Sequence, residues 1–231
     1  MSLKIKSGLG LAAIVLATVA ATQTAFAETV KITPLGSHDG EFCRLDRAGR
    51  TVAGPEDPRL GKIDVVLVSH MHGDHVGDRR LASVNAGSCG KPDFSVKTTP
   101  NTNSVEIALA KDAKIVTGSE MPSFFAEKLK SLGGDSSSSQ LVRFGASRSI
   151  NGVSITTVPA VHSNGISGHM IGGELGDMLN AAGLTAYAGP STGYVLTCSN
   201  GLVVYLSGDT RITGEQELVV RQHYGAKLAV I

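Results

Sequence analysis

Short aliphatic runs alternate with amphipathic stretches along most of this chain. Residues 63–69 (IDVVLVS) are aliphatic and largely β-branched, which is typical of a strand buried on both faces. The Asn-Gly pair at 200–201 predicts a hairpin, because this pair favours the tight turns that join antiparallel strands. Taken together, the pattern predicts strands at residues 30–35, 63–69, 114–117, 140–144, 153–159, 194–198, 202–206 and 228–231.

Three other segments have the apolar spacing of helices, namely residues 105–110, 123–132 and 215–223. The polar residues 135–139 are interpreted as a surface loop. Residues 163–192 are rich in Gly and Ser, with one helical turn expected near 175–182. A connection of this length in a compact domain is usually functional or mobile, so it forms either part of a substrate-binding rim or a surface insertion.

The first 27 residues have the organisation of a secretory signal peptide. Lys4 and Lys6 precede an apolar stretch at 9–20, and Ala25-Phe26-Ala27 is a small-x-small cleavage site. We therefore expect a signal peptide at 1–27, a domain at 28–231, and a periplasmic or secreted protein with no stable membrane anchor. An uncleaved anchor is the alternative, since the apolar stretch is borderline for spanning a bilayer.

The composition is that of an ordinary globular domain, with 42% hydrophobic and 18% charged residues among 231. Removal of two lysines with the signal peptide leaves 19 basic and 20 acidic residues (21 − 2 against 20), a net charge of −1. This balance argues against a nucleic-acid partner, because such binding requires phosphate neutralisation. Of the three cysteines, Cys43 and Cys89 are the favoured disulfide pair, since Cys198 lies in an apolar strand; the connectivity stays open.

Polar residues directly after the aliphatic strand carry the chemistry. Residues 69–78 read SHMHGDHVGD, and buried imidazoles or carboxylates are costly unless paired or metal-bound. Side chains two apart in an extended chain project to the same side, so His70 and His72 can converge on one ion. Gly73 permits a turn that lets Asp74 and His75 face a second ion. The density of the cluster disfavours a solvated polar loop.

This H-x-H-x-D-H pattern resembles that of the metallo-β-lactamase superfamily. Two further matches follow in order at strand ends: His162 after Thr157-Val158-Pro159, and Asp209 in LSGDT at 206–210. The resemblance runs from about residue 30 to the end of the sequence. It implies an α/β (α+β) fold, a four-layer αββα sandwich with metals at one edge between the sheets.

The resemblance also implies a ligand set. His70, His72 and His162 would hold a first metal, and Asp74 and His75 a second, with Asp209 between the two. One or two divalent ions are expected, zinc first, with Mn²⁺ or Fe²⁺ as alternatives. Ser207 and Thr210 are expected to support Asp209 by hydrogen bonds.

Two departures from the superfamily pattern stand out. The superfamily supplies one more histidine to the second metal, beyond the strand that begins at residue 228. The sequence stops at Ile231, so we expect a C-terminally truncated fragment, incomplete in its last part. Residues 37–62 are polar where a hairpin usually occurs, so this region looks shortened.

A metal-activated hydroxide predicts hydrolysis of an ester, lactone, amide or phosphodiester bond in a small-molecule substrate, with Asp74 orienting water and accepting its proton. Asp209 replaces the thiolate of cysteine-bearing β-lactamases, and the sequence around it is most similar to the ascorbate-phosphate-lactonase-like branch. Two alternatives stay open: a mononuclear iron dioxygenase of sulfur compounds, and a metal-binding protein without catalysis. The sequence has no P-loop, so nucleotide triphosphate chemistry lacks support. The oligomeric state is left open.

Overall fold

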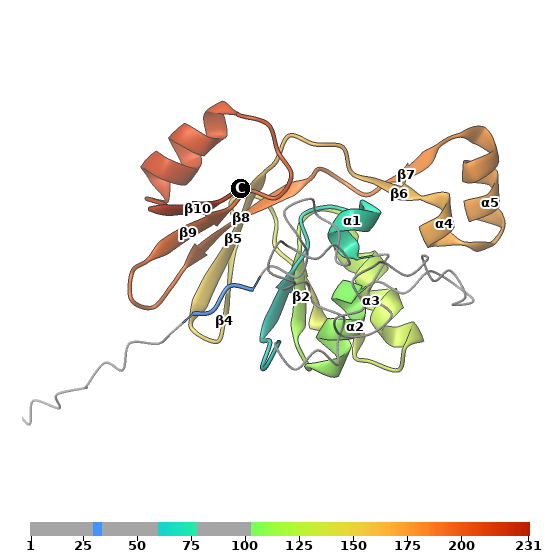
Figure 1. Ribbon diagram of the computed structural model, residues 1–231, viewed down its shortest axis with the longest axis horizontal. Coiled ribbons are helices and arrows are strands. Elements are labelled where there is room, and N and C mark those ends of the chain that lie inside the picture. Colours follow the sequence, from blue (N-terminus) through green and yellow to red (C-terminus); the bar gives the residue numbers. More distant parts are fainter. Residues whose placement is uncertain (1–29, 34–59, 78–102) are drawn as a thin grey trace, which may run out of the picture.

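A computed structural model describes residues 30–33, 60–77 and 103–231. Two β-sheets lie face to face, with helices outside them (Figure 1). The smaller sheet is parallel and has the order β1 (Val65–Leu67), β2 (Lys114–Thr117) and β3 (Ser139–Leu141). The larger sheet is mixed and has the order β10 (Leu228–Val230), β9 (Val203–Leu206), β8 (Thr192–Thr197), β5 (Val153–Pro159) and β4 (Ser147–Ile150).

Helices and single helical turns flank the two large sheets. Two of them, α2 (Asn103–Ala110) and α3 (Met121–Ser131), cover the smaller sheet, and the π-helix η2 (Gln216–His223) covers the larger one. A single turn, α1 (Gly73–Val76), follows β1, and the 3₁₀ turn η1 (Ser136–Ser138) precedes β3. None of the helices in the described ranges is long and apolar enough to cross a membrane.

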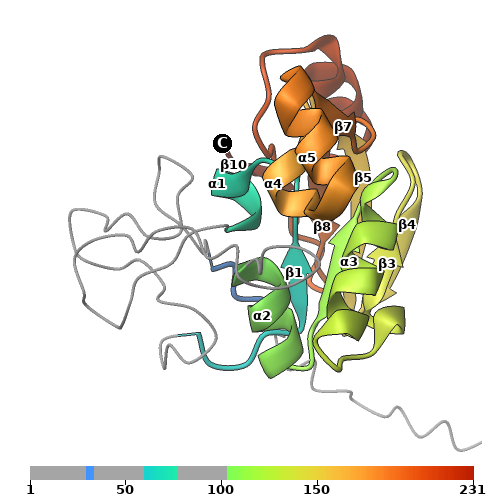
Figure 2. The same cartoon turned by 90° about the vertical axis from the view of Figure 1, so that its right-hand side faces the viewer.

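A separate arm projects from the sandwich. The antiparallel pair β6 (Gly165–Ser167) and β7 (Thr185–Tyr187) extends outward and carries α4 (Gly168–Ile171) and α5 (Gly173–Ala182) at its end (Figures 1 and 2). The arm leaves the sandwich shortly after β5 and returns just before β8.

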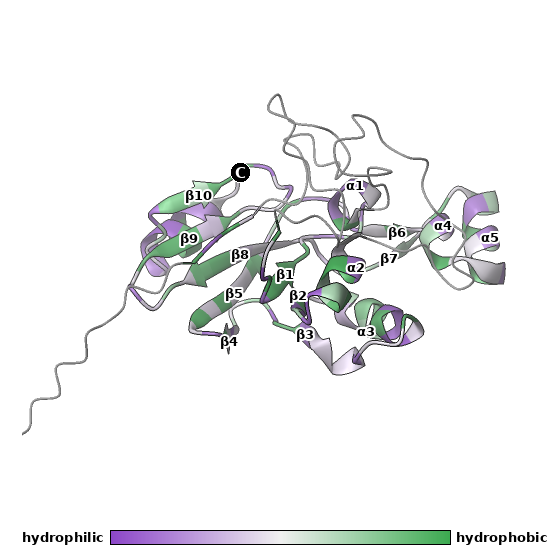
Figure 3. Ribbon diagram, turned by 60° about the horizontal axis from the view of Figure 1, so that its bottom comes forward, coloured by the Kyte–Doolittle hydropathy of each residue, from purple (hydrophilic) through white to green (hydrophobic). Residues whose placement is uncertain are grey.

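Alternation of side chains along the central strands produces the layers. In β1, Val66 packs beneath α2 and α3, whereas Val65 and Leu67 face the opposite sheet. In β8, Tyr194 belongs to the core between the sheets, and Val195 packs towards η2. Apolar residues therefore fill three successive interfaces, and Figure 3 shows the hydrophobic strands enclosed by helices with polar outer faces. The expected αββα arrangement is confirmed.

Most predicted elements are present, and the C-terminal run forms β10 parallel to β9. The polar loop expected at residues 135–139 contains η1. The strand expected at 140–144 ends at Leu141, because the chain then turns away and only Phe144 forms a bridge, to Thr157. The signal peptide at 1–27 and the pair Cys43 and Cys89 lie outside the described residues. Cys198 is buried and free, as its apolar strand indicated.

Two sequence-based expectations need correction. The strand predicted at 30–35 is absent over residues 30–33, and residues 34–35 lie outside the described ranges. A segment with β-propensity forms a strand only when it pairs with the edge of another strand. Conversely, β4 was not predicted, because Ser147–Ile150 (SRSI) is polar and exposed, and only its ladder with β5 makes it a strand. Residues 163–192 hold two strands and two helices rather than a loop with one turn.

One hydroxyl group links the two sheets across their shared core. The side chain of Tyr194 extends from β8, is 2% exposed, and donates to the carbonyl oxygens of Val68 at 2.6 Å and Val116 at 3.0 Å. Burial raises the pKa of this phenol, which keeps it protonated and able to donate. The bond to Val68 fixes the chain at the point where β1 leads into the histidine cluster.

Replacing Tyr194 by Phe removes this hydroxyl and leaves two buried carbonyl groups without that donor. We expect Tyr194→Phe to lower the free energy of unfolding by about 1–3 kcal/mol, measured by urea denaturation. Tyr187→Phe on the exposed β7 is the matched control and is expected to change stability by less than about 0.5 kcal/mol. Equal stability of the two variants would contradict the bridging role of the hydroxyl.

Candidate metal centre

All six predicted site residues lie at one edge of the sandwich, where strands of both sheets end. His70, His72, Asp74 and His75 follow β1, His162 follows β5, and Asp209 follows β9. β1 belongs to the smaller sheet, whereas β5 and β9 belong to the larger one. Residues more than ninety positions apart in the sequence therefore meet only because the two sheets pack together.

Three imidazole nitrogens converge within this edge. The Nε2 atom of His70 lies 3.1 Å from Nδ1 of His72, which lies 3.3 Å from Nε2 of His162. Ligand nitrogens about 2.0–2.1 Å from a tetrahedral zinc ion would be roughly 3.3 Å apart. One proton can lie between only two of these nitrogens, whereas a single cation can accept all three lone pairs. These three residues therefore fit a divalent metal ion.

A second group shares His70 with the first. Ligand atoms of His70, His75 and Asp209 lie within 4.8 Å of one another, and Oδ2 of Asp209 is 3.6 Å from Nε2 of His75. The same Oδ2 is 3.3 Å from Nε2 of His162, so the Asp209 carboxylate lies between the two groups. Asp74 belongs to neither group, although its Oδ2 is 3.6 Å from Nε2 of His75.

The single turn of α1 explains how the second group reaches the site. The helix begins directly after His72 and ends at Gly77, whose φ of 78° forms a left-handed cap. The turn brings the ring of His75 beside that of His70, with the two centroids 4.0 Å apart. The turn expected at Gly73 is therefore a helical turn rather than an isolated bend.

Burial sets the charge state of the innermost histidine. His70 is fully buried, and this burial, together with the neighbouring imidazoles, lowers its pKa to about 2. Burial also lowers the pKa of His75, although the carboxylates of Asp74 and Asp209 oppose that shift. His70 is thus neutral near pH 7, which is the form of imidazole that coordinates a metal.

Close backbone packing holds the strand ends together. Gly208 has a φ of 62°, and a Cβ atom there would lie 2.7 Å from Cβ of Ser69. Any larger residue would push Asp209 away from His70. The hydroxyl of Ser69 lies 2.9 Å from Nδ1 of His70, on the side of the ring that faces away from the nitrogen cluster. A contact of this kind orients a ligating imidazole.

The expected roles of Ser207 and Thr210 need refinement. Ser207 donates to the carbonyl of Gly208, and Thr210 accepts from the backbone N–H of Val161 at 2.8 Å. Both hydroxyls therefore secure backbone near the site. Sequence reasoning missed the supporting roles of Ser69, Asn164 and Ser191, because single Ser and Asn residues carry no spacing signal. Their contacts appear only in the folded chain.

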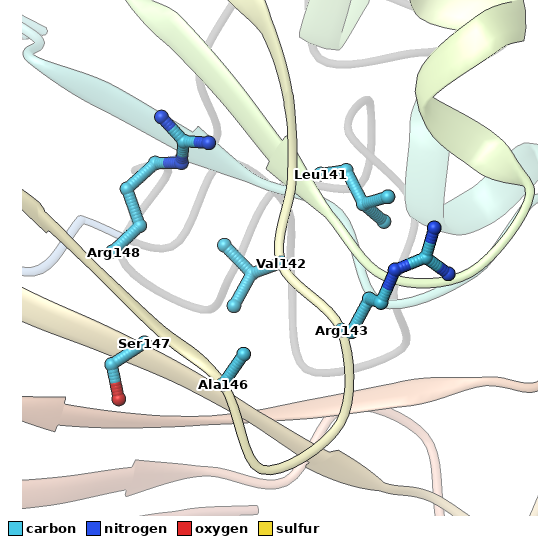
Figure 4. A pocket seen from close by; sticks show the side chains of 6 residues that line it. All are labelled: Leu141, Val142, Arg143, Ala146, Ser147 and Arg148. Carbon is cyan, nitrogen blue, oxygen red and sulfur yellow. The ribbon is translucent and has the colours of Figure 1, made fainter.

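A shallow pocket lies elsewhere on the molecule, where β3 leads into β4 (Figure 4). Two arginine side chains flank its opening and point in different directions. None of the six site residues contributes to its lining, which consists of Leu141, Val142, Arg143, Ala146, Ser147 and Arg148. The convergence of ligand atoms, and not this hollow, identifies the chemical site.

Fold and site together define an αββα protein with a metal-binding edge. The chain belongs to the family described as "Beta-lactamase superfamily domain", which matches residues 43–231. It is 25% identical over 190 residues to a "UPF0173 metal-dependent hydrolase" of Koribacter versatilis, covering 81% of this chain and 61% of that protein. A protein of the same description from Pyrococcus abyssi is 31% identical over 138 residues, covering 60% of this chain and 47% of the relative.

The chain thus spans about half to three-fifths of the length of these curated relatives. Among solved structures, it is similar to Igni18, a metallo hydrolase from Ignicoccus hospitalis. That match has 20% identity and a TM-score of 0.43, and covers 75% of this chain and 54% of that one. Nothing about the reaction follows from so low a score.

The low pKa of His70 predicts acid sensitivity of the metal-free protein. An unfolded histidine has a pKa of about 6.5, so below that pH the unfolded chain binds a proton that folded His70, with its pKa of about 2, does not. The contribution of His70 to the free energy of unfolding is fully present above pH 6.5. It falls by up to about 1.4 kcal/mol per pH unit as the pH decreases.

Urea denaturation of metal-free protein at pH 7 and pH 5 checks this expectation. On acidification, the free energy of unfolding of the wild type should decrease by about 1–2 kcal/mol more than that of His70→Asn. The exposed His223 at the end of η2 provides the control, and His223→Asn should follow wild type. Equal losses of unfolding free energy in His70→Asn and wild type would contradict the lowered pKa of His70.

Proposed function

We propose that this protein is a metal-dependent hydrolase. The observation that carries the proposal is the convergence of three imidazole nitrogens, contributed by both sheets, around a point beside the Asp209 carboxylate. The curated relatives named as metal-dependent hydrolases support the same conclusion. A cluster of four imidazoles and two carboxylates at one sheet edge has no packing function that apolar side chains would not serve better.

Zinc is the metal that this donor set suits best, since imidazole nitrogens and carboxylates in tetrahedral spacing are its usual ligands. We assign His70, His72 and His162 to one ion, and His75, Asp74 and Asp209 to a neighbouring position, with Asp209 between them. A bound divalent ion would lower the pKa of coordinated water from about 15.7 to about 7 and polarise the substrate's oxygen.

The protein's own residues supply the remaining parts of the reaction. Neutral His70 donates a lone pair without first losing a proton, and Ser69 holds its ring in place. Asp74 lies at the partly exposed rim of the cluster, where its carboxylate can orient water and accept a proton during attack. His162 is also partly exposed, so substrate would approach from this side.

The substrate we propose is a small molecule with an ester, lactone, amide or phosphodiester bond. Asp209 stands where cysteine-bearing β-lactamases have a thiolate, which favours the lactonase-like and phosphodiesterase-like branches of the superfamily. A nucleic-acid substrate is disfavoured, because the chain without residues 1–27 carries a net charge of only −1 (19 basic against 20 acidic residues). The leader-like segment at 1–27 supports action in the periplasm or outside the cell.

Removing ligands tests the proposal directly. In an activity panel of a lactone, a phosphodiester and a β-lactam, we expect His72→Ala and Asp209→Ala each to reduce turnover by about 10²-fold or more, because weaker perturbations outside the ligand set already cost 10–100-fold. Elemental analysis of each purified variant should show less bound metal. The exposed His223 again supplies the control, so His223→Ala should keep both metal and turnover.

The same measurements separate the competing functions. Bound zinc with turnover on one of the three substrates supports the hydrolase. One iron per chain with oxygen uptake on a thiol substrate would indicate a dioxygenase instead of a hydrolase. Bound metal without any turnover would indicate a metal-binding protein. Wild-type rates in His72→Ala or Asp209→Ala would refute the assigned site.

A further inference from the structure

Asn164 ties two of the metal-binding segments together through its side chain. It lies two residues after His162 and is only 6% exposed. Its Oδ1 accepts a hydrogen bond from the backbone N–H of Met71 at 2.8 Å, and its Nδ2 donates to the carbonyl of Ala188 at 3.1 Å. Both ends of the amide are therefore used, each on a different segment of the chain.

The first of these bonds lies at a sensitive position. Met71 stands between His70 and His72, and its own side chain is fully buried in the core beneath α2 and α3. β1 has ended at Leu67, so the Met71 N–H has left the strand ladder. A buried N–H requires an acceptor, since an unmade bond costs about 1–3 kcal/mol. Asn164 supplies that acceptor and thereby fixes the backbone between the two imidazoles.

The second bond anchors the His162 segment from the other side. The carbonyl of Asn164 also accepts from the N–H of Ala188 at 3.1 Å, so backbone and side chain hold the same pair. Three residues further on, the buried hydroxyl of Ser191 lies 3.1 Å from each of the carbonyl oxygens of His162 and Ser163. The chain that enters β8 thus supports the whole segment carrying His162.

We propose that Asn164 is a positioning residue of the metal centre. By bonding Met71 while it is itself held by Ala188, it sets the separation between the His70–His72 turn and the ring of His162. This inference rests on the proposed metal site and extends it to a residue that touches neither metal nor substrate. Preorganised ligands bind a cation more tightly, because little conformational freedom is lost on binding.

Two substitutions at Asn164 separate the effects of its two bonds. Asn164→Ala removes both bonds. Asn164→Asp keeps an acceptor for the Met71 N–H and replaces the donor to Ala188 with an oxygen that faces a carbonyl. Asn200, in the exposed β8–β9 turn, provides a matched control, because its Oδ1 accepts from the N–H of Leu202 at the end of β9 opposite to Asp209. Asn200→Ala therefore also removes an Asn side chain that bonds the backbone.

Cobalt binding to metal-free protein measures the effect without relying on turnover. We expect the dissociation constant for Co²⁺, from competition with a chromophoric chelator, to rise about 10–100-fold in Asn164→Ala and less in Asn164→Asp. The visible absorption of the bound Co²⁺ should change in Asn164→Ala, since ligand geometry determines that spectrum. Asn200→Ala should match wild type in both affinity and spectrum.

The outcomes distinguish this inference from the proposed function. Wild-type cobalt affinity and spectrum in Asn164→Ala would overturn the positioning role and leave the metal site intact. Failure of wild-type protein to bind Co²⁺ would overturn the metal site itself. If Asn164→Ala does not fold, as judged by circular dichroism, Asn164→Asp and Ser191→Ala carry the test, and unchanged cobalt affinity in both would overturn the inference.

Discussion

The site depends on the packing of two sheets that share no strand. β1 leads into His70, His72 and His75 from the smaller sheet, whereas β5 and β9 bring His162 and Asp209 from the larger one. Burial of apolar side chains between the sheets drives this association, but hydrophobic packing has no direction and does not by itself set a register. Directional bonds do so here. Tyr194 reaches across the core to Val68, and the N–H of Thr192 donates to the carbonyl of Ser69 at 2.9 Å.

The histidine cluster is costly to the fold in the absence of a cation. Imidazole rings of His70 and His75 lie with their centroids 4.0 Å apart, and those of His70 and His72 4.5 Å apart. Ring nitrogens of His70 and His72 lie 3.1 Å apart, where lone pairs repel if no proton lies between them, and protonation would add like charges in a buried place. The rest of the sandwich must therefore stabilise an arrangement that becomes favourable once a metal satisfies the nitrogens. Unfavourable interactions of this kind are typical of functional sites.

A polar network around the cluster holds the histidines in place despite their unfavourable interactions. Ser69 contacts the ring of His70, and Thr210 bonds the backbone next to His162. Gly208 allows the Asp209 segment to approach Ser69 more closely than any residue with a side chain would. Each of these residues is small, and each acts on backbone or on the far side of a ring. The ligand atoms themselves are left free to face the metal position.

The aliphatic run at 63–69 and the histidines that follow it were sufficient to predict a buried strand and a metal-binding turn, because both signals are local. Most strands, the helices at α2 and α3, and the layered fold were predictable in the same way, through periodicity and resemblance. The strand β4 was not, since SRSI has no apolar alternation and pairs only because β5 presents an edge. The arm at 163–187 was not predictable either, because its many glycines made the two helices look like a loop.

By itself, therefore, the sequence determined which residue types gather after β1 and which strands are buried, because spacing along a chain is enough to specify a face. Only the tertiary structure decided that Nε2 of His162 lies 3.3 Å from Nδ1 of His72, and that the amide of Asn164 bonds Met71. Those contacts join segments about ninety residues apart. Their geometry follows from how two sheets pack, which no local pattern encodes.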